Sequence, residues 1–118
     1  MSQRKVGPIL TEILAALDGI EQATSGKSLH DFENDWLLKH GVQRGIEIIS
    51  EAARHLPDEL LATETEIPWK QIRGIGNVLR HEYHKIADPI VWAVVTDNLP
   101  ALRHAVVRIA TEVTRRES

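Results

Sequence analysis

Side chains that could bind phosphate or transfer a proton are concentrated between residues 73 and 84. They are Arg73, Asn77, Arg80, His81 and His84. If this segment is one helix, with about 100° per residue, all five project within a sector of roughly 100°. The neighbouring apolar residues fall outside that sector and would face a core. Such a polar face has the groups that cleavage of an RNA phosphodiester needs when no metal takes part.

Each of these side chains suits one part of that reaction. Histidine is the side chain whose ordinary pKa lies closest to neutrality, so His81 is the expected general acid or base. Arginine is always cationic and can donate two parallel hydrogen bonds, so Arg80 and Arg73 are expected to hold the phosphoryl oxygens. Asn77 lies one turn before His81 and could orient the imidazole or bind the ribose. Tyr83 falls beside this face, where its hydroxyl could reach the site.

Two other interpretations of the segment are open at this point. A helix face of this composition could simply be solvated. His81 and His84, spaced i, i+3, could also touch one metal ion, and Glu51 and His55 form a single i, i+4 pair. Neither pair is joined by a second pair that would complete a metal site. We therefore expect no metal and no other cofactor.

Composition limits the kind of protein that could carry this chemistry. The chain has 118 residues, which fits one domain over residues 1–118, and its formal charge is −3 at pH 7. Because an acidic chain does not attract nucleic acid in general, an RNA substrate would require locally concentrated positive charge. The absence of cysteine excludes disulfides, a cysteine nucleophile and thiolate zinc sites. No stretch is typical of a signal peptide or long enough to span a membrane, so a soluble, cytoplasmic protein is expected.

The apolar spacing predicts an all-α protein, an antiparallel four-to-five-helix bundle. Long helices are expected over about 7–24, over about 34–56, from Pro68 to about residue 86, and from Pro89 to the C-terminal tail. Asp88 is the expected N-cap of the last of these, and Pro100 is expected to bend or restart it. Shorter helical segments are expected within 29–36 and 58–67.

Two details of this pattern bear on the polar face. Gly74 and Gly76 each cost a helix interior about 1 kcal/mol relative to alanine, which suggests a local break or a close approach of another group. The three tryptophans, Trp36, Trp69 and Trp92, lie on helical patterns. Large aromatic residues are mostly buried, so we expect them in the core or an interface rather than as platforms for bases.

Residues 77–83 resemble the site motif of the HepT-like toxins, which belong to the HEPN superfamily. That motif runs Arg-x(4–6)-His, commonly as Arg-Asn-x-x-x-His-x-Tyr. The chain matches it from Asn77 through His81 to Tyr83. Further similarity lies in residues 46–57, 67–69, 88–92 and 97–100. The resemblance therefore extends over nearly the whole chain.

The resemblance implies a HEPN fold and a metal-independent endoribonuclease, the toxin of a type II or type VII-like toxin–antitoxin pair. Similar proteins form two-fold homodimers in which two copies of the motif share a cleft for RNA. Their partner is usually an MNT-type nucleotidyltransferase antitoxin, which in several pairs attaches AMP to the motif tyrosine. Tyr83 occupies that position here and is the implied AMP acceptor. Phosphate added there would compete with RNA for the same arginines.

One position departs from the family motif, because Gly76 stands where its arginine is expected. Arg80 lies one turn later on nearly the same side, and Arg73 one turn before the asparagine, so either could bind the same phosphate. Arg44, on the preceding long helix, could add a cation, with His84 as a further supporting side chain. Alternatively, the chain is a catalytically degenerate HEPN module that binds RNA or a nucleotidyltransferase without cleavage, or a plain helical dimerisation domain.

Overall fold

The computed structural model describes residues 5–117, except for the side chain of residue 83. Its elements, in chain order, are α1 (Val6–Thr24), α2 (Leu29–Asn34), α3 (Trp36–Ala53), α4 (Asp58–Leu61), α5 (Trp69–Glu82), the 3₁₀ turn η1 (Tyr83–Lys85), α6 (Asp88–Ala93), the π-helical turn η2 (Val94–Asn98) and α7 (Leu99–Glu117). This part of the chain contains no strand. The predicted all-α class is confirmed.

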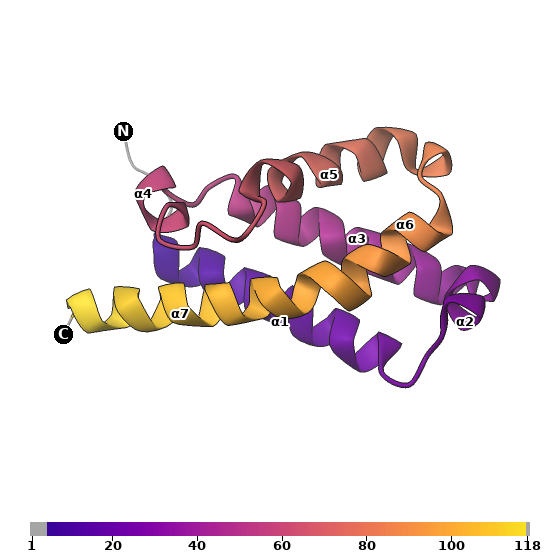
Figure 1. The fold of residues 1–118 in the computed structure, drawn as a ribbon, viewed down its shortest axis with the longest axis horizontal. Coiled ribbons are helices and arrows are strands. Elements are labelled where there is room, and N and C mark those ends of the chain that lie inside the picture. Colours follow the sequence, from indigo (N-terminus) through magenta and orange to yellow (C-terminus); the bar gives the residue numbers. More distant parts are fainter. Residues whose placement is uncertain (1–4, 118) are drawn as a thin grey trace.

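Helix α3 lies between α1 and α5, and α7 packs along α1 (Figure 1). Matched contacts show that the neighbours run antiparallel. Arg73 of α5 reaches the carbonyl oxygens that follow the last turns of α3, whereas Gly76, further along α5, meets the earlier Ser50. Similarly, Arg103 near the start of α7 pairs with Asp18 near the end of α1, at 2.7 Å. The predicted antiparallel bundle is therefore present.

Apolar side chains at i, i+3 and i+4 spacing form one core between these helices. The fully buried members come mainly from the long helices and include Ile9, Ile13, Val42, Ile49, Leu79, Val91, Leu102, Val106 and Ile109. Burying each such side chain stabilises the fold by about 1.5–3 kcal/mol. Gly45 of α3 allows close packing here, since a Cβ on it would lie 2.8 Å from two Ile20 side-chain atoms of α1.

The C-terminal third is one nearly continuous helical run with a π-turn in it (Figure 1). Pro100 has no N–H to donate, and the turn just before it is wide, with the Leu99 N–H donating to the Val94 carbonyl. Pro100 thus coincides with a widened turn rather than a break.

The prediction of Asp88 as N-cap is wrong, because Ala87 is the N-cap. Asp88 instead pairs with Lys39 of α3 at 2.9 Å.

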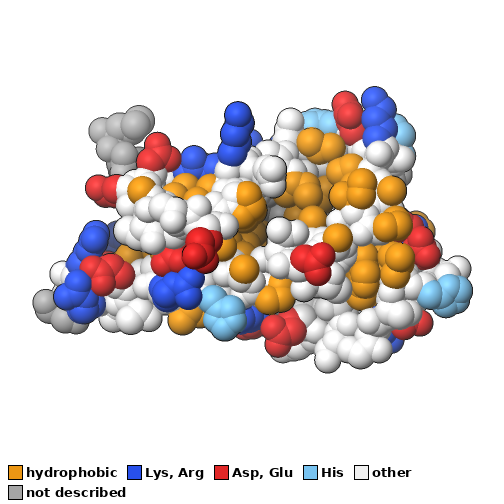
Figure 2. Space-filling model, in the orientation of Figure 1, with side chains coloured by type: hydrophobic (Ala, Val, Ile, Leu, Met, Phe, Trp, Pro, Cys, Tyr) orange, Lys and Arg blue, Asp and Glu red, His pale blue; other side chains and the backbone are white. Residues whose placement is uncertain are grey.

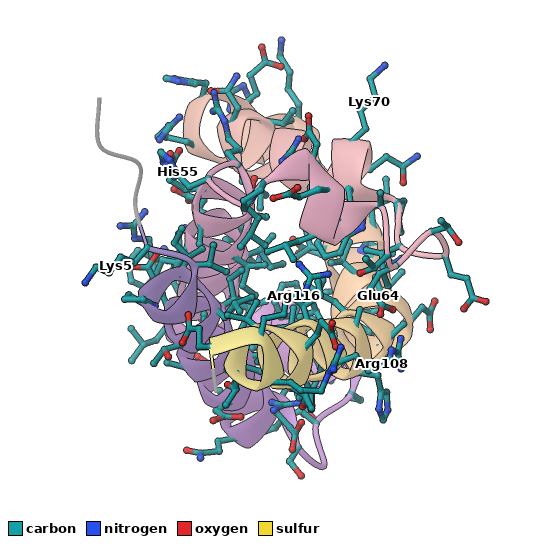
Figure 3. All side chains as sticks on the ribbon, turned by 90° about the vertical axis from the view of Figure 1, so that its left-hand side faces the viewer. Lys5, His55, Glu64, Lys70, Arg108 and Arg116 are labelled. Carbon is teal, nitrogen blue, oxygen red and sulfur yellow. The ribbon has the colours of Figure 1, made fainter. Side chains whose placement is uncertain are left out.

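The connection from α4 to α5 is held by side-chain contacts. The Trp69 indole N–H donates to the carbonyl oxygens of Leu61 and Glu64, at 3.1 Å each. Arg108 of α7 donates to the Glu64 carboxylate, at 2.7 Å for the shorter contact, and the two side chains meet in Figure 3.

The other two tryptophans differ in burial. Trp92 packs on Phe32 with 5.2 Å between ring centroids. Trp36 is not in the core: it is 70% exposed.

No helix among the described residues is both long enough and apolar enough to cross a membrane.

Candidate active site

Helix α5 carries the candidate residues on its exposed side. Leu79 and Gly76 are buried against the bundle, whereas Asn77, Arg80 and His81 are exposed. The helix ends at Glu82, earlier than the predicted end near residue 86, because the chain turns through η1 to reach α6. His84 lies in η1, so its predicted place on the helical face is wrong. It is nevertheless exposed.

An open cavity of about 680 Å³ lies where α1, α3 and α5 meet. We call it the α1–α3–α5 cavity, and its lining consists of Glu12, Ala15, Ala16, Arg44, Glu47, Ile48, Ser50, Glu51, Arg54, Gly76, Asn77 and Arg80. Three of the predicted site residues, Arg44, Asn77 and Arg80, therefore share one space. His81 follows Arg80 directly in α5 and is exposed outside this lining. The side chain of Tyr83 lies outside the described residues.

Gly76, at the position of the motif arginine, is buried under Ser50 of α3. The Gly76 N–H donates to the Ser50 hydroxyl at 3.0 Å, and that hydroxyl donates to the Arg73 carbonyl at 3.0 Å. A Cβ on Gly76 would lie 2.6 Å from both the Cβ and the Oγ of Ser50, which is too close for any side chain. The close approach that the glycines suggested is thus confirmed for Gly76. Gly74 has open space around its Cβ direction.

Arg73, a predicted phosphate binder, makes hydrogen bonds to the end of α3, and its role toward phosphate stays a prediction. Its Nη2 donates to the Leu56 carbonyl at 2.8 Å, its Nε to the Ala53 carbonyl at 3.2 Å, and its Nη1 contacts Asp58 at 3.3 Å. Carbonyl groups at a helix C-terminus lack helical partners and carry partial negative charge, which attracts a cation. The guanidinium therefore caps α3, and it does not line the α1–α3–α5 cavity.

Arg80 and Arg44 differ in how their charge is engaged. Arg80 donates from Nη2 to Asn77 Oδ1, a neutral acceptor, at 3.2 Å. Arg44 contacts Glu47 at 3.3 Å, and Arg54 contacts Glu51 at 3.9 Å. Such exposed i, i+3 pairs contribute only about 0–1 kcal/mol, so a phosphate could compete for these arginines. With three arginines and three glutamates, the lining is charged but balanced.

Histidine, acidic and basic side chains gather over the C-terminal end of α5 (Figure 2). Within the described part of the chain, no three potential metal ligands of the His, Cys, Asp and Glu types lie together. Glu51 and His55 contact one another at 3.1 Å as their spacing suggested. His55 projects from the end of α3 on the side away from Lys70 (Figure 3).

Among the cavity residues that sequence reasoning did not single out are Ser50 and Arg54. Ser50 had a recognisable signal, since it is a small polar residue beside the apolar stripe of α3, opposite a helix that contains Gly76. Arg54 is the C-cap of α3 and follows Glu51 at i, i+3. Nothing in its spacing distinguishes it from an ordinary surface arginine.

Comparisons of the sequence with known proteins identify its family. A family model described as "Ribonuclease HepT-like" matches residues 13–109. A protein of Methanocaldococcus jannaschii named "Putative RNase" is 29% identical over 106 residues, which make up 90% of this chain and 97% of the relative. Another so named, from Caldanaerobacter subterraneus subsp. tengcongensis, is 33% identical over 102 residues, 86% of this chain and 91% of the relative.

A third relative, from Thermococcus cleftensis, is named "Probable ribonuclease HepT" and is 30% identical over 94 residues, 80% of this chain and 86% of its own. No solved structure gives a significant match. The helical bundle and the motif on α5 thus define a domain of the HEPN class. Within that class, the chain belongs to the HepT-like family.

Proposed function

We propose that this protein is a metal-independent endoribonuclease that acts at the edge of the α1–α3–α5 cavity. One observation carries the proposal: Arg80 and Asn77 of α5 open into the same cavity as Arg44 of α3, and the exposed His81 follows Arg80 directly. The relatives named as RNases support RNA as the substrate. Arg80 takes the role of the missing motif arginine, because it lies one turn beyond position 76, where there is no room for a side chain.

The proposed reaction divides the work between proton transfer and charge stabilisation. A base removes the proton of the ribose 2′-hydroxyl, and the 2′-oxygen attacks the adjacent phosphorus. The bond to the 5′-oxygen breaks, and an acid protonates that oxygen, leaving a 2′,3′-cyclic phosphate and a 5′-hydroxyl. His81 serves as one of these proton-transfer groups. Arg80, assisted by Arg44, stabilises the charge that develops on the phosphoryl oxygens.

We propose that the active form is a homodimer whose two sites share a cleft. An apolar groove of about 580 Å³ between α1 and α3 supports this assembly. Leu37, which is 74% exposed, lines the groove, and Ala16, Arg44 and Ile48 line both the groove and the cavity. A second copy covering the groove would therefore lie next to the catalytic groups. Two-fold symmetry would also bring the arginines of both cavities to one cleft.

The biological role that we propose is that of a toxin controlled by an MNT-type nucleotidyltransferase. In this scheme the partner transfers AMP to Tyr83, the first residue of η1. The added phosphate would place negative charge near Arg80 and reduce its attraction for RNA. Co-expression with a neighbouring nucleotidyltransferase should add the mass of AMP to Tyr83. Loss of that mass in Tyr83→Phe is the control, and persistent absence in the native chain would remove this part of the proposal.

A second candidate function is supported by the packing of Gly76. Because Ser50 closes position 76, an arginine cannot project from it without moving α5 away from α3. If Arg80 does not compensate, the chain is a degenerate module that binds RNA or the nucleotidyltransferase without cutting. Removal of one transition-state donor of this kind costs about 10²–10³ in rate, so residual cleavage would be weak.

Cleavage of RNA by the purified protein tests the first candidate against the second. The native chain should produce 2′,3′-cyclic phosphate ends in the presence of EDTA, and His81→Ala should not. His104→Ala, a histidine on α7 outside the cavity lining, is the matched control and should retain cleavage. RNA binding without cleavage by the native chain would favour the degenerate module, and inhibition by EDTA would contradict metal independence.

A further inference from the structure

Trp36, the first residue of α3, is an exposed aromatic residue with a defined orientation. It is 70% exposed, and its indole stacks on the His40 imidazole, with 4.2 Å between centroids and 27° between planes. The His40 Nδ1 lies 2.8 Å from the Trp36 carbonyl oxygen, which holds the two rings together. Because the Trp36 indole is mostly exposed, it contributes little hydrophobic stabilisation to the fold. The stack therefore presents an oriented aromatic surface to the solvent.

The stack is aligned with the cations of the candidate site. Trp36, His40 and Arg44 follow one another at i, i+4 and i+8, so they form one stripe on α3. Eight residues of helix separate Trp36 from Arg44 by about 12 Å, a length that a few nucleotides span at about 3.4 Å per stacked step. Arg44 in turn lines the cavity with Asn77 and Arg80.

The same end of α3 lies next to the end of α5 that carries His81. The two helices run antiparallel, so the C-terminal end of α5 lies alongside the N-terminal half of α3 (Figure 1). An ion pair of 2.9 Å between Lys39 of α3 and Asp88, the first residue of α6, joins the same half of α3 to the segment that follows α5. An RNA strand at Arg44 and Arg80 could thus continue along α3 to Trp36.

We propose that the Trp36–His40 stack is a platform for one unpaired RNA base, and that Arg44 and Arg80 bind a phosphate a few nucleotides along the same strand. The inference rests on the proposed function for its ligand. Surfaces that bind single-stranded RNA combine cations that follow the backbone with aromatic rings that stack on bases. A protein partner has the apolar groove available, which Leu37 lines and to which neither Trp36 nor His40 contributes.

Binding of a short single-stranded RNA to the non-cleaving His81→Ala protein tests the platform. Replacing Trp36 with Ala in that background should weaken binding by about 5- to 150-fold, the usual effect of one lost stacking contact. Trp36→Tyr, which keeps an aromatic face, should retain most of the affinity. Val107→Ala is the control, since it removes an exposed apolar side chain of α7 that lines neither the cavity nor the groove, and it should bind RNA as the parent does.

An abasic scan identifies the contacted base. RNA lacking a base at one position should bind more weakly to the parent protein, and this sensitivity should disappear in Trp36→Ala. Equal affinity of the Trp36→Ala and parent proteins for RNA, or loss of self-association as the sole effect of Trp36→Ala, would overturn the platform. Base-dependent binding by a native chain that never cleaves RNA would uphold it while refuting the ribonuclease proposal. Absence of RNA binding altogether would overturn it.

Discussion

The Ser50 hydroxyl of α3 bridges two backbone groups of α5 at Gly76, accepting from the Gly76 N–H and donating to the Arg73 carbonyl, each at 3.0 Å. Ser50 is buried, so both capacities of its hydroxyl are used inside the protein. The contact requires glycine, since a Cβ at position 76 would lie 2.6 Å from the Ser50 side chain. The missing motif arginine is therefore tied to the packing of the two helices that carry the site.

Gly76→Ala should destabilise the protein by about 1–3 kcal/mol, because the new methyl group forces α3 and α5 apart. The measurement is the free energy of unfolding from chemical denaturation followed by circular dichroism. Gly74→Ala is the control within the same helix, where open space surrounds the added Cβ. It should stabilise the protein by up to about 1 kcal/mol through its higher helix propensity. Similar effects of the two substitutions would contradict the packing argument.

Gly76→Arg should for the same reason lose stability rather than simply restore the family motif. Its cleavage rate must be compared with its melting curve, because a displaced α5 also displaces Arg80. Combining it with Ser50→Gly removes both the Cβ and the hydroxyl that obstruct position 76. The double variant should recover part of the lost stability, as expected for two residues in direct contact.

Arg73→Ala and Arg80→Ala should separate stability from activity. Arg73→Ala removes the hydrogen bonds to the Ala53 and Leu56 carbonyl oxygens and should cost about 1–3 kcal/mol of unfolding free energy. Arg80→Ala removes an exposed side chain and should change stability by less than about 0.5 kcal/mol. Its RNA cleavage should nevertheless fall by about 10²–10³. Unchanged cleavage in Arg80→Ala would show that this arginine does not replace the motif arginine.

Asn77 should act through Arg80, because its Oδ1 accepts the hydrogen bond from the Arg80 guanidinium. Asn77→Ala leaves that guanidinium without its orienting partner and should reduce RNA affinity in the His81→Ala background by about tenfold. Val78→Ala, an adjacent exposed position, is the control. In an Arg80→Ala protein the effect of Asn77→Ala should largely disappear. A full effect there would mean that Asn77 contacts RNA independently.

The capping box of α2 should lose its contribution in acid. Hydrogen bonds from the backbone N–H and then the side chain of Ser28 lower the pKa of Asp31 below its ordinary value. Since the folded-state pKa lies below the unfolded one, this stabilisation is present above the unfolded pKa and is lost as pH falls through the folded pKa. Native and Asp31→Asn proteins should therefore differ in unfolding free energy near about pH 6, and the difference should disappear once the pH falls below the folded-state pKa of Asp31. A constant difference would contradict this account.

Much of the fold followed from periodicity along the chain. The predicted helix over about 7–24 corresponds to Val6–Thr24, and that over about 34–56 contains Trp36–Ala53, since i, i+3 and i+4 apolar spacing reports directly which face of a helix is buried. The motif from Asn77 to Tyr83 was also readable, because it is contained in one short segment. The roles assigned to its side chains stay predictions.

Only the tertiary structure decided which groups on neighbouring helices meet. Arg73 looked equivalent to Arg80 on a helical wheel, but the carbonyl groups at the end of α3 engage it. Gly76 looked like a lost catalytic residue, yet Ser50 requires it. Trp36 had a core-like spacing but lies exposed on the stripe that leads to Arg44. Periodicity determines which way a side chain points from its own helix, whereas its partner is determined by the distance and angle at which another helix packs.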